Sequence, residues 1–211
     1  MEISRAEFAE TASHWDRSQR GWGPGVRHVT FHLTFPDAPQ LHAASQRFAA
    51  AAQGLAGVGV VPQEWLHLTM VGLGVASDLD GDRIDRAAAE VFRRAPLGTE
   101  PLRFGRLWLS ETGVLLAADN VAWLDDLKRV QDEVAAVHGT HPDRSTPREF
   151  RPHVTLAYFD GPVDIDELER RIHQLGLDDV AVQAPVLALI DLQRVRGLYS
   201  WRTLDEHRLG E

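Results

Sequence analysis

"VPQEWLHLTMVGLG", residues 61–74, and "REFRPHVTLAYF", residues 148–159, decide the fold of this chain of 211 residues. Each stretch carries the tripeptide His-apolar-Thr within an apolar run, once at residues 67–69 and once at residues 153–155. In a β-strand, side chains two residues apart lie on the same face, about 6.5–7 Å from each other. Each stretch is therefore predicted to be a strand that presents an imidazole and a hydroxyl on one face and buries the apolar residue between them.

An imidazole and a hydroxyl on one face are a useful pair for phosphate chemistry. An imidazole accepts or donates a proton near neutral pH, and a hydroxyl donates a hydrogen bond to a phosphate oxygen. Two such strands that face each other would surround one phosphate with two imidazoles and two hydroxyls. One histidine could then activate water or a sugar hydroxyl while the other protonates the leaving oxygen, without a metal.

A third stretch, "RHVTFHLTFP" at residues 27–36, contains the same tripeptide twice. Its strict alternation predicts one strand with an apolar face toward the helices and a polar face on the opposite side. The polar stripe on this strand consists of His28, Thr30, His32 and Thr34. Because its two histidines share one strand, they cannot flank a phosphate from two sides. We expect the stripe to form the floor of a cleft between His67 and His153, either as a hydrogen-bonded polar face or as part of the substrate channel.

The rest of the chain alternates between helical and strand patterns. Residues 1–24 form a polar leader with a short helix around Arg5 to Trp15. Apolar periodicity predicts helices over 38–54, 82–94 and 164–175, and a further helix that Asn120 caps and whose apolar stripe runs from Trp123 to Val137. Strands are predicted over 26–35, 64–71, 101–109, 113–118, 150–158, 184–192 and 197–204. With no linker inside residues 25–211, we expect a single α+β domain with helices on the outer faces of the sheet.

Composition places the chain among globular proteins, with 44% hydrophobic and 25% charged residues. No apolar run reaches the roughly 18–20 residues that span a membrane, and the charged N-terminus lacks the apolar segment of a signal peptide. The absence of cysteine excludes disulfides and cysteine-based zinc sites. The net charge of −9 argues against bulk binding to long nucleic acid, but not against a small phosphorylated ligand. We expect a cytoplasmic monomer.

In these motifs the sequence resembles the two-histidine (2H) phosphoesterase superfamily of 2′-5′ RNA ligase-like proteins and cyclic phosphodiesterases. The resemblance covers residues 26–209 and rests on both motif blocks, the first strand ending in Pro36, and the closing stretch "RVRGLYSWRTLDEHRL". It implies a bilobal fold of two pseudo-symmetric antiparallel-sheet lobes around a central cleft. It also implies catalysis by His67, Thr69, His153 and Thr155, with 2′,3′-cyclic or 2′-5′ phosphates of nucleotides or RNA ends as substrates. Which histidine is the acid and which the base stays open.

Other side chains are candidates for substrate binding. They are His28 and His32 in the polar stripe, Trp65 before the first motif, Arg148 and Arg151 (with Arg144) before the second, and Tyr158 after it. Four histidines near one cleft are also compatible with a metal site, because imidazole is a common zinc ligand. However, no carboxylate or cysteine stands at a spacing from them that is typical of metal ligands, so we expect no metal or cofactor. Three alternatives remain open: a non-catalytic module that binds nucleotides or RNA ends, an RNA end ligase, and a cyclic-oligonucleotide hydrolase.

Overall fold

The computed structural model describes residues 1–17, 22–23, 25–96, 98, 100–119, 121–140, 150–195 and 197–209. Its large sheet is built from β1 (Glu2–Arg5), β2 (Arg27–Thr34), β3 (Val58–Val60), β4 (His67–Val75), β6 (Arg106–Ser110), β7 (Gly113–Ala117), β8 (His153–Phe159), β10 (Val186–Val195) and β11 (Leu198–Arg208). A separate pair joins β5 (Leu102–Phe104) to β9 (Val180–Val182). The described α-helices are α1 (His14–Arg17), α2 (Pro39–Ala52), α3 (Gly81–Arg94), α4 (Ala122–His138) and α5 (Ile165–Leu175).

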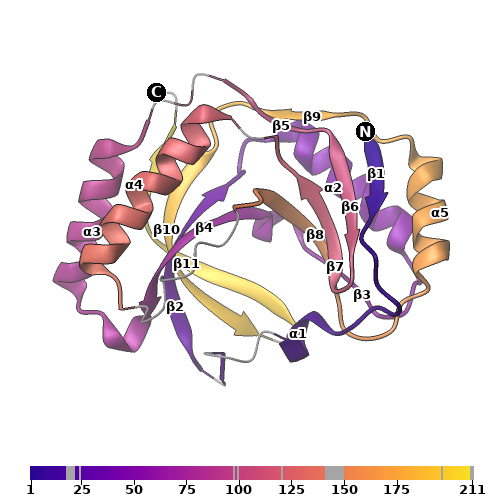
Figure 1. Ribbon diagram of the computed structural model, residues 1–211, viewed down its shortest axis with the longest axis horizontal. Helices are drawn as coiled ribbons and strands as arrows, with labels where there is room; N and C mark the ends of the chain where they lie inside the picture. Colours follow the sequence, from indigo (N-terminus) through magenta and orange to yellow (C-terminus); the bar gives the residue numbers. More distant parts are fainter. Residues whose placement is uncertain are drawn as a thin grey trace.

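The large sheet has two halves that meet at β4 and β8. Its strand order is β1-β6-β7-β8-β4-β2-β10-β11, with β3 paired to β8 outside this path. All its pairings are antiparallel except that of β1 with β6. Helices α3 and α4 pack together beside the half that contains β2, β10 and β11, whereas α2 and α5 pack together beside the other half (Figure 1). The expected α+β architecture with antiparallel sheet and outer helices is confirmed.

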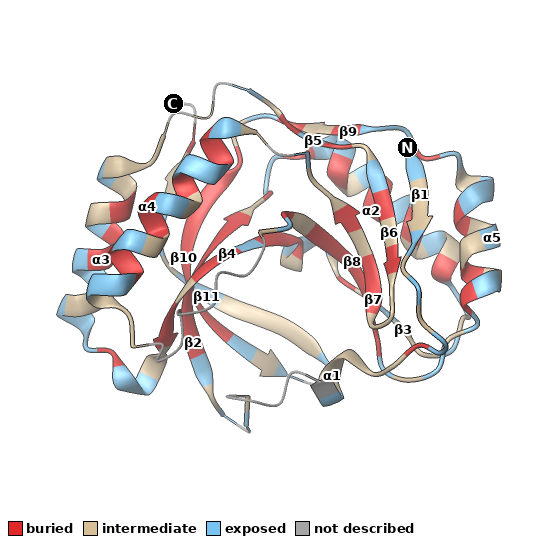
Figure 2. Cartoon of the chain, in the orientation of Figure 1, coloured by how far each residue is buried: buried red, intermediate tan, exposed pale blue. Residues whose placement is uncertain are grey.

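Alternation along β2 explains how the sheet buries one face. The side chains of Val29, Phe31 and Leu33 are at most 1% exposed and belong to the main hydrophobic core. The opposite face of the same strand carries the polar stripe. Figure 2 shows that the strands near the centre of the molecule are mostly buried, while the outward faces of α3 and α4 are exposed. The core thus lies between the sheet and its helices and leaves the polar face of the strands for the site.

Two expectations about local structure differ from the structure. The strand expected over 101–109 breaks at Gly105 into β5 and β6, which belong to different sheets. The leader forms the strand β1 and the single turn of α1 instead of a helix from Arg5 to Trp15. Its residues 2–5 pair in parallel with β6 at the edge of the large sheet, where backbone groups would otherwise be unpaired. The cap expected at Asn120 lies outside the described residues.

No helix among the described residues is both long and apolar enough to cross a membrane.

Candidate active site

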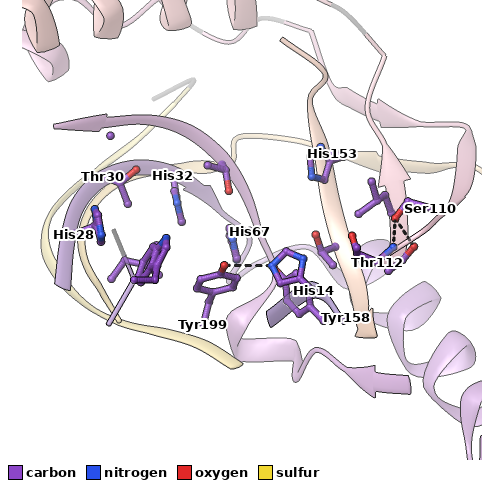
Figure 3. Close-up of a pocket in the computed structure, with 17 residues that line it drawn as sticks. His14, His28, Thr30, His32, His67, Ser110, Thr112, His153, Tyr158 and Tyr199 are labelled. Carbon is purple, nitrogen blue, oxygen red and sulfur yellow. Dashed lines mark hydrogen bonds between the residues drawn. The ribbon is translucent and has the colours of Figure 1, made fainter. Parts of the chain in front are cut away.

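The two His-apolar-Thr motifs lie next to each other where β4 meets β8. Their middle residues, Leu68 and Val154, are partners in the antiparallel register. Antiparallel pairing therefore sets His67 on the side of Thr155, and Thr69 on the side of His153. All four side chains line one pocket of about 580 Å³ (Figure 3). The structure thus brings together the two imidazoles and two hydroxyls that the sequence predicts as partners.

Backbone carbonyls fix the orientation of both imidazoles. Nδ1 of His67 lies 2.8 Å from the carbonyl oxygen of Trp65, and Nδ1 of His153 lies 2.7 Å from that of Arg151. A carbonyl oxygen only accepts hydrogen bonds, so each Nδ1 carries a proton and donates it. In the neutral ring, the lone pair is then on Nε2. Each histidine is therefore held in the tautomer that accepts a proton at Nε2.

The two histidines lie in different environments. His67 is 8% exposed, whereas His153 is only partly buried. Burial lowers the pKa of His67 to about 4, partly opposed by its hydrogen bond to the Trp65 carbonyl, and charge on His153 lowers this pKa further. His67 is consequently a neutral imidazole at physiological pH. Two coupled groups in unequal environments are suited to opposite roles in proton transfer.

The ring of His32 packs against the ring of His67. The two rings are stacked with centroids 4.4 Å apart and 2° between their planes. His32 is fully buried, and neither of its ring nitrogens has a hydrogen-bond partner among the described residues. Burial holds the pKa of His32 well below its usual range, and charge on His67 lowers it further. His32 is therefore packed against His67 at the edge of the pocket, and its expected role in substrate binding stays a prediction.

The polar stripe faces the pocket but not at the expected place. His28, Thr30 and His32 line the same pocket as the two motifs, whereas Thr34 lines a neighbouring one. In the sheet, β2 pairs with β4 on the side away from β8. The stripe therefore extends the site beyond His67 instead of forming a floor between His67 and His153. The sequence could not show this because strand order is not encoded in the alternation of one strand.

A β-bulge turns Tyr158 into the pocket. Between β7 and β8, Val114 pairs with Ala157 and Leu115 with Thr155, so β8 carries one extra residue at this point. The extra residue shifts the alternation, and both Thr155 and Tyr158 line the pocket. Burial raises the pKa of the Tyr158 hydroxyl, which is also hydrogen-bonded to Thr155. Tyr158 thus remains a candidate for substrate binding, as a protonated phenol.

The turn between β6 and β7 adds hydroxyls that the sequence analysis missed. Ser110 and Thr112 line the pocket, and the Ser110 hydroxyl donates to the carbonyl of Gly113 over 2.8 Å. A Cβ atom at Gly113 would lie 2.4 Å from the carbonyl oxygen of Ala157, so only glycine allows this close approach. The only signal in the sequence was the short gap between the strands predicted over 101–109 and 113–118, and such a gap does not predict which strand it approaches.

Two other candidates, Trp65 and Arg151, are not among the residues that line this pocket. Trp65 is outside the pocket and packs edge-on against Trp201, with ring centroids 4.8 Å apart. The guanidinium of Arg151 lies 5.6 Å above the ring of Trp108, in an adjoining pocket that His153 also lines. Arg144 and Arg148 lie outside the described residues. Trp65 ends a short 3-10 helix (Gln63–Trp65) before β4, and there its ring packs against a second large ring.

Further lining residues come from the two ends of the chain. His14 and Trp22 belong to the N-terminal leader, whereas Leu192 and Tyr199 belong to β10 and β11. The Nε2 atom of His14 lies 3.2 Å from the Tyr199 hydroxyl. Burial lowers the pKa of His14 to about 4, with a smaller contribution from Arg194. No pattern in the leader indicates that it contributes to a site, because its contacts are set by the pairing of β1 with β6.

Among the residues that the structure describes, no group of three or more histidine, aspartate or glutamate side chains is arranged to hold a metal ion.

A comparison with known protein families shows which family this chain belongs to. The family model described as the 2'-5' RNA ligase superfamily matches residues 35–196, which is most of the chain. The chain belongs to this superfamily, that of the 2H phosphoesterases. Both motifs lie inside the match, whereas the leader, the whole polar stripe and Tyr199 lie outside it.

Solved structures show the same fold as this 2H chain. A structure titled as a phosphoesterase has 17% identity and a TM-score of 0.55, over 88% of this chain and 99% of its own. LigT of E. coli complexed with 3'-AMP has 16% identity and a TM-score of 0.54, over the same shares. TT0787 of Thermus thermophilus has 19% identity and a TM-score of 0.56, over 87% of this chain and 98% of its own. Among curated proteins, no sequence matches the chain significantly.

Proposed function

We propose that this protein is a metal-independent phosphodiesterase that acts on 2′,3′-cyclic or 2′-5′ phosphodiester bonds of nucleotides or RNA ends. The observation that carries the proposal is the pairing of Leu68 with Val154, which sets two imidazoles and two hydroxyls around one pocket. Membership of the 2H superfamily supports a phosphoesterase. The structures of E. coli LigT with 3'-AMP, ATP and NADP+ support a nucleotide as the ligand class.

In this mechanism His67 is the general base. It is neutral at physiological pH, and its Nε2 lone pair is available because Nδ1–H is donated to the Trp65 carbonyl. Nε2 of His67 accepts a proton from water as the water oxygen attacks phosphorus. In a 2′,3′-cyclic phosphate, the attack opens the ring by breaking one of the two bonds from phosphorus to a ribose oxygen.

His153 is the general acid. Its Nδ1–H is donated to the Arg151 carbonyl, so a protonated ring presents Nε2–H to the leaving ribose oxygen. The product is a phosphate monoester. His67 then releases the proton that it gained to solvent, and His153 takes up a proton from solvent, so that both rings return to their starting states. A charge on His153 also lowers the pKa of His67, which keeps the two rings in different protonation states.

Thr69 and Thr155 are the proposed hydrogen-bond donors to the non-bridging phosphate oxygens. They come from opposite strands and line the same pocket as the imidazoles. Negative charge on these oxygens changes during attack, and donors that are already in place stabilise it without reorganisation. Thr155 is buried and its side chain is hydrogen-bonded to Tyr158, whereas Thr69 is exposed to the pocket.

The test is a panel of nucleoside 2′,3′-cyclic phosphates, 2′-5′-linked dinucleotides and RNA ends, each incubated with the protein in EDTA. Turnover of at least one substrate, with loss of turnover in His67→Ala and in His153→Ala, supports the proposal. Binding of nucleotides without any product would instead favour a non-catalytic module. Joining of a cyclic phosphate end to a 5′-hydroxyl end, without hydrolysis, would favour a ligase.

A further inference from the structure

One border of the pocket is an aromatic wall that both ends of the chain build. We define this wall as His14, Trp22, His28, Tyr158 and Tyr199, all of which line the pocket. Of its members, only Tyr158 lies within the residues that match the superfamily model. The wall thus lies largely outside the matched residues and outside the acid–base set of the two motifs. Figure 3 shows Tyr199, His14 and Tyr158 next to one another, with His67 close by.

The rings of the wall are in contact with one another. The centroids of Trp22 and His28 are 4.2 Å apart, and those of Trp22 and Tyr199 are 5.5 Å apart. His14 lies 4.4 Å from Tyr158 by ring centroids and hydrogen-bonds the Tyr199 hydroxyl. Such distances are those of tilted and edge-on aromatic packing. The wall is therefore a continuous aromatic surface rather than a set of separate rings.

The part of the leader before His14 is held in place by hydrogen bonds to the rest of the chain. Beyond the β1–β6 pairing, the backbone N–H groups of Ala6 and Ala12 donate hydrogen bonds to the carbonyl oxygens of Leu109 and Glu111, respectively. The N···O distance is 2.9 Å in both bonds. The hydroxyl of Thr11 accepts from the amide of Val163 at 2.7 Å. These contacts fasten the leader beside the β6–β7 turn. His14 follows directly and reaches the pocket.

Two members of the wall, His14 and Tyr158, are uncharged at neutral pH. Burial keeps His14 neutral by lowering its pKa to about 4 and keeps Tyr158 protonated by raising its pKa. The remaining described lining residues include no aspartate, glutamate, lysine or arginine. An aromatic surface is suited to the face of a planar ring, since every nucleobase presents a π-face. A second phosphate would find no charged partner among these described residues.

We propose that the aromatic wall is a binding subsite for the nucleobase of the substrate, and that Trp22 and His14 make the enzyme select nucleotides over phosphodiesters without a base. This inference rests on the proposed function, since it places the base beside the phosphate that His67 and His153 would cleave. The pocket of about 580 Å³ lies within the range of small-ligand sites. The substrate class is therefore a nucleotide or a short terminal unit.

The experiment compares two cyclic phosphates that differ only in the base. Adenosine 2′,3′-cyclic phosphate and ribose 2,3-cyclic phosphate are assayed with the wild type, Trp22→Ala, Trp22→Phe and His14→Ala. Loss of stacking predicts that Trp22→Ala lowers kcat/KM for the adenosine substrate roughly 5- to 100-fold, mainly through KM. Its loss on the ribose substrate should be at least fivefold smaller, and Trp22→Phe should recover most of the difference. The matched control is Phe92→Ala, which removes a ring that packs on Phe31 at the core face of the sheet.

Equal losses on the two substrates in Trp22→Ala would assign a structural role to the ring and overturn the subsite. Unchanged selectivity in both Trp22→Ala and His14→Ala would also overturn it. If the wild type hydrolyses neither compound, the proposed function fails, and the subsite is tested separately by calorimetric titration. In that case adenosine 3′-monophosphate should bind more tightly than ribose 5-phosphate, and Trp22→Ala should remove the preference. Equal binding of the two phosphates by the wild type would contradict the subsite.

Discussion

Leu68 and Val154 are partners across β4 and β8, and they form the one register pair described between these strands. Both side chains are fully buried in the main core. Each is also the middle residue of a His-apolar-Thr motif. The apolar residues on one face of this contact therefore position the imidazoles and hydroxyls on the other.

Truncation of Leu68 should destabilise the protein. Leu68→Ala removes buried methyl groups and leaves a cavity beneath the site, so we expect the free energy of unfolding to fall by about 2–5 kcal/mol. Leu68→Met keeps most of the volume and should cost less than about 1.5 kcal/mol. Urea unfolding of the three proteins at one pH measures both values. Equal stability of Leu68→Ala and the wild type would show that this contact is poorly packed.

Substitution of the proposed hydroxyl donors should lower kcat more than it raises KM. In Thr69→Val, the lost donor to a non-bridging oxygen should reduce kcat about 10²- to 10³-fold, because the interaction is stronger in the transition state. Thr69→Ser retains the hydroxyl and serves as the matched control. Steady-state kinetics on a cyclic nucleotide measure the change. A variant that alters only KM would show that Thr69 binds the ground state and the transition state equally.

The pH dependence of kcat/KM should have an unusually low acid limb. The base must be neutral to accept a proton, and burial lowers the pKa of His67 to about 4. Activity should therefore persist below the ordinary histidine value of 6.5 and fall as the pH drops through about 4. The profile of kcat/KM reports the free enzyme. An acid limb centred near the ordinary value would contradict the assignment of His67 as a buried base.

Stability should also decrease toward acid pH. His14, His32 and His67 all have folded-state pKa values below the unfolded value of 6.5, so the unfolded chain takes up protons first as the pH falls. Their contribution to stability is fully present above 6.5 and is lost as the pH falls to about 4. Urea unfolding over this range measures the slope. A stability independent of pH there would show that these rings are hydrated.

His32→Phe isolates one part of that slope. The substitution removes one titrating group and two ring nitrogens that have no partner among the described residues, while it keeps a ring against His67. We expect the pH dependence of stability to become shallower and the free energy of unfolding at neutral pH to rise by about 1 kcal/mol. A loss of several kcal/mol would show instead that His32 holds a buried water or another polar partner.

Sequence patterns predicted the elements that depend on local periodicity. The helix expected over 82–94 is observed as α3 at Gly81–Arg94, and the helix expected over 164–175 is observed as α5 at Ile165–Leu175. The division of β2 into an apolar face and a polar face was also predicted. These features follow from the spacing of residues along one segment. That spacing determines which side chains share a face of a helix or strand, but not which other element lies beside it.

Features that depend on pairing between distant segments could not be predicted. The strand order that sets β2 beyond β4, and the bulge that turns Tyr158 inward, arise from register between strands. The same holds for His14, which follows the segment that pairs at the edge of the sheet, and for Trp22, whose ring contacts His28. Trp65 was expected at the site because of its position near His67 in the sequence, but its ring packs against Trp201.

The most direct test of the central claim is hydrolysis of nucleoside 2′,3′-cyclic phosphates in EDTA by the wild type, His67→Ala and His153→Ala. The account predicts turnover by the wild type without added metal, and a loss of about 10²- to 10⁴-fold in each variant, with folding verified by circular dichroism. Full activity in either folded variant, or activity that requires added metal, would contradict the two-histidine mechanism.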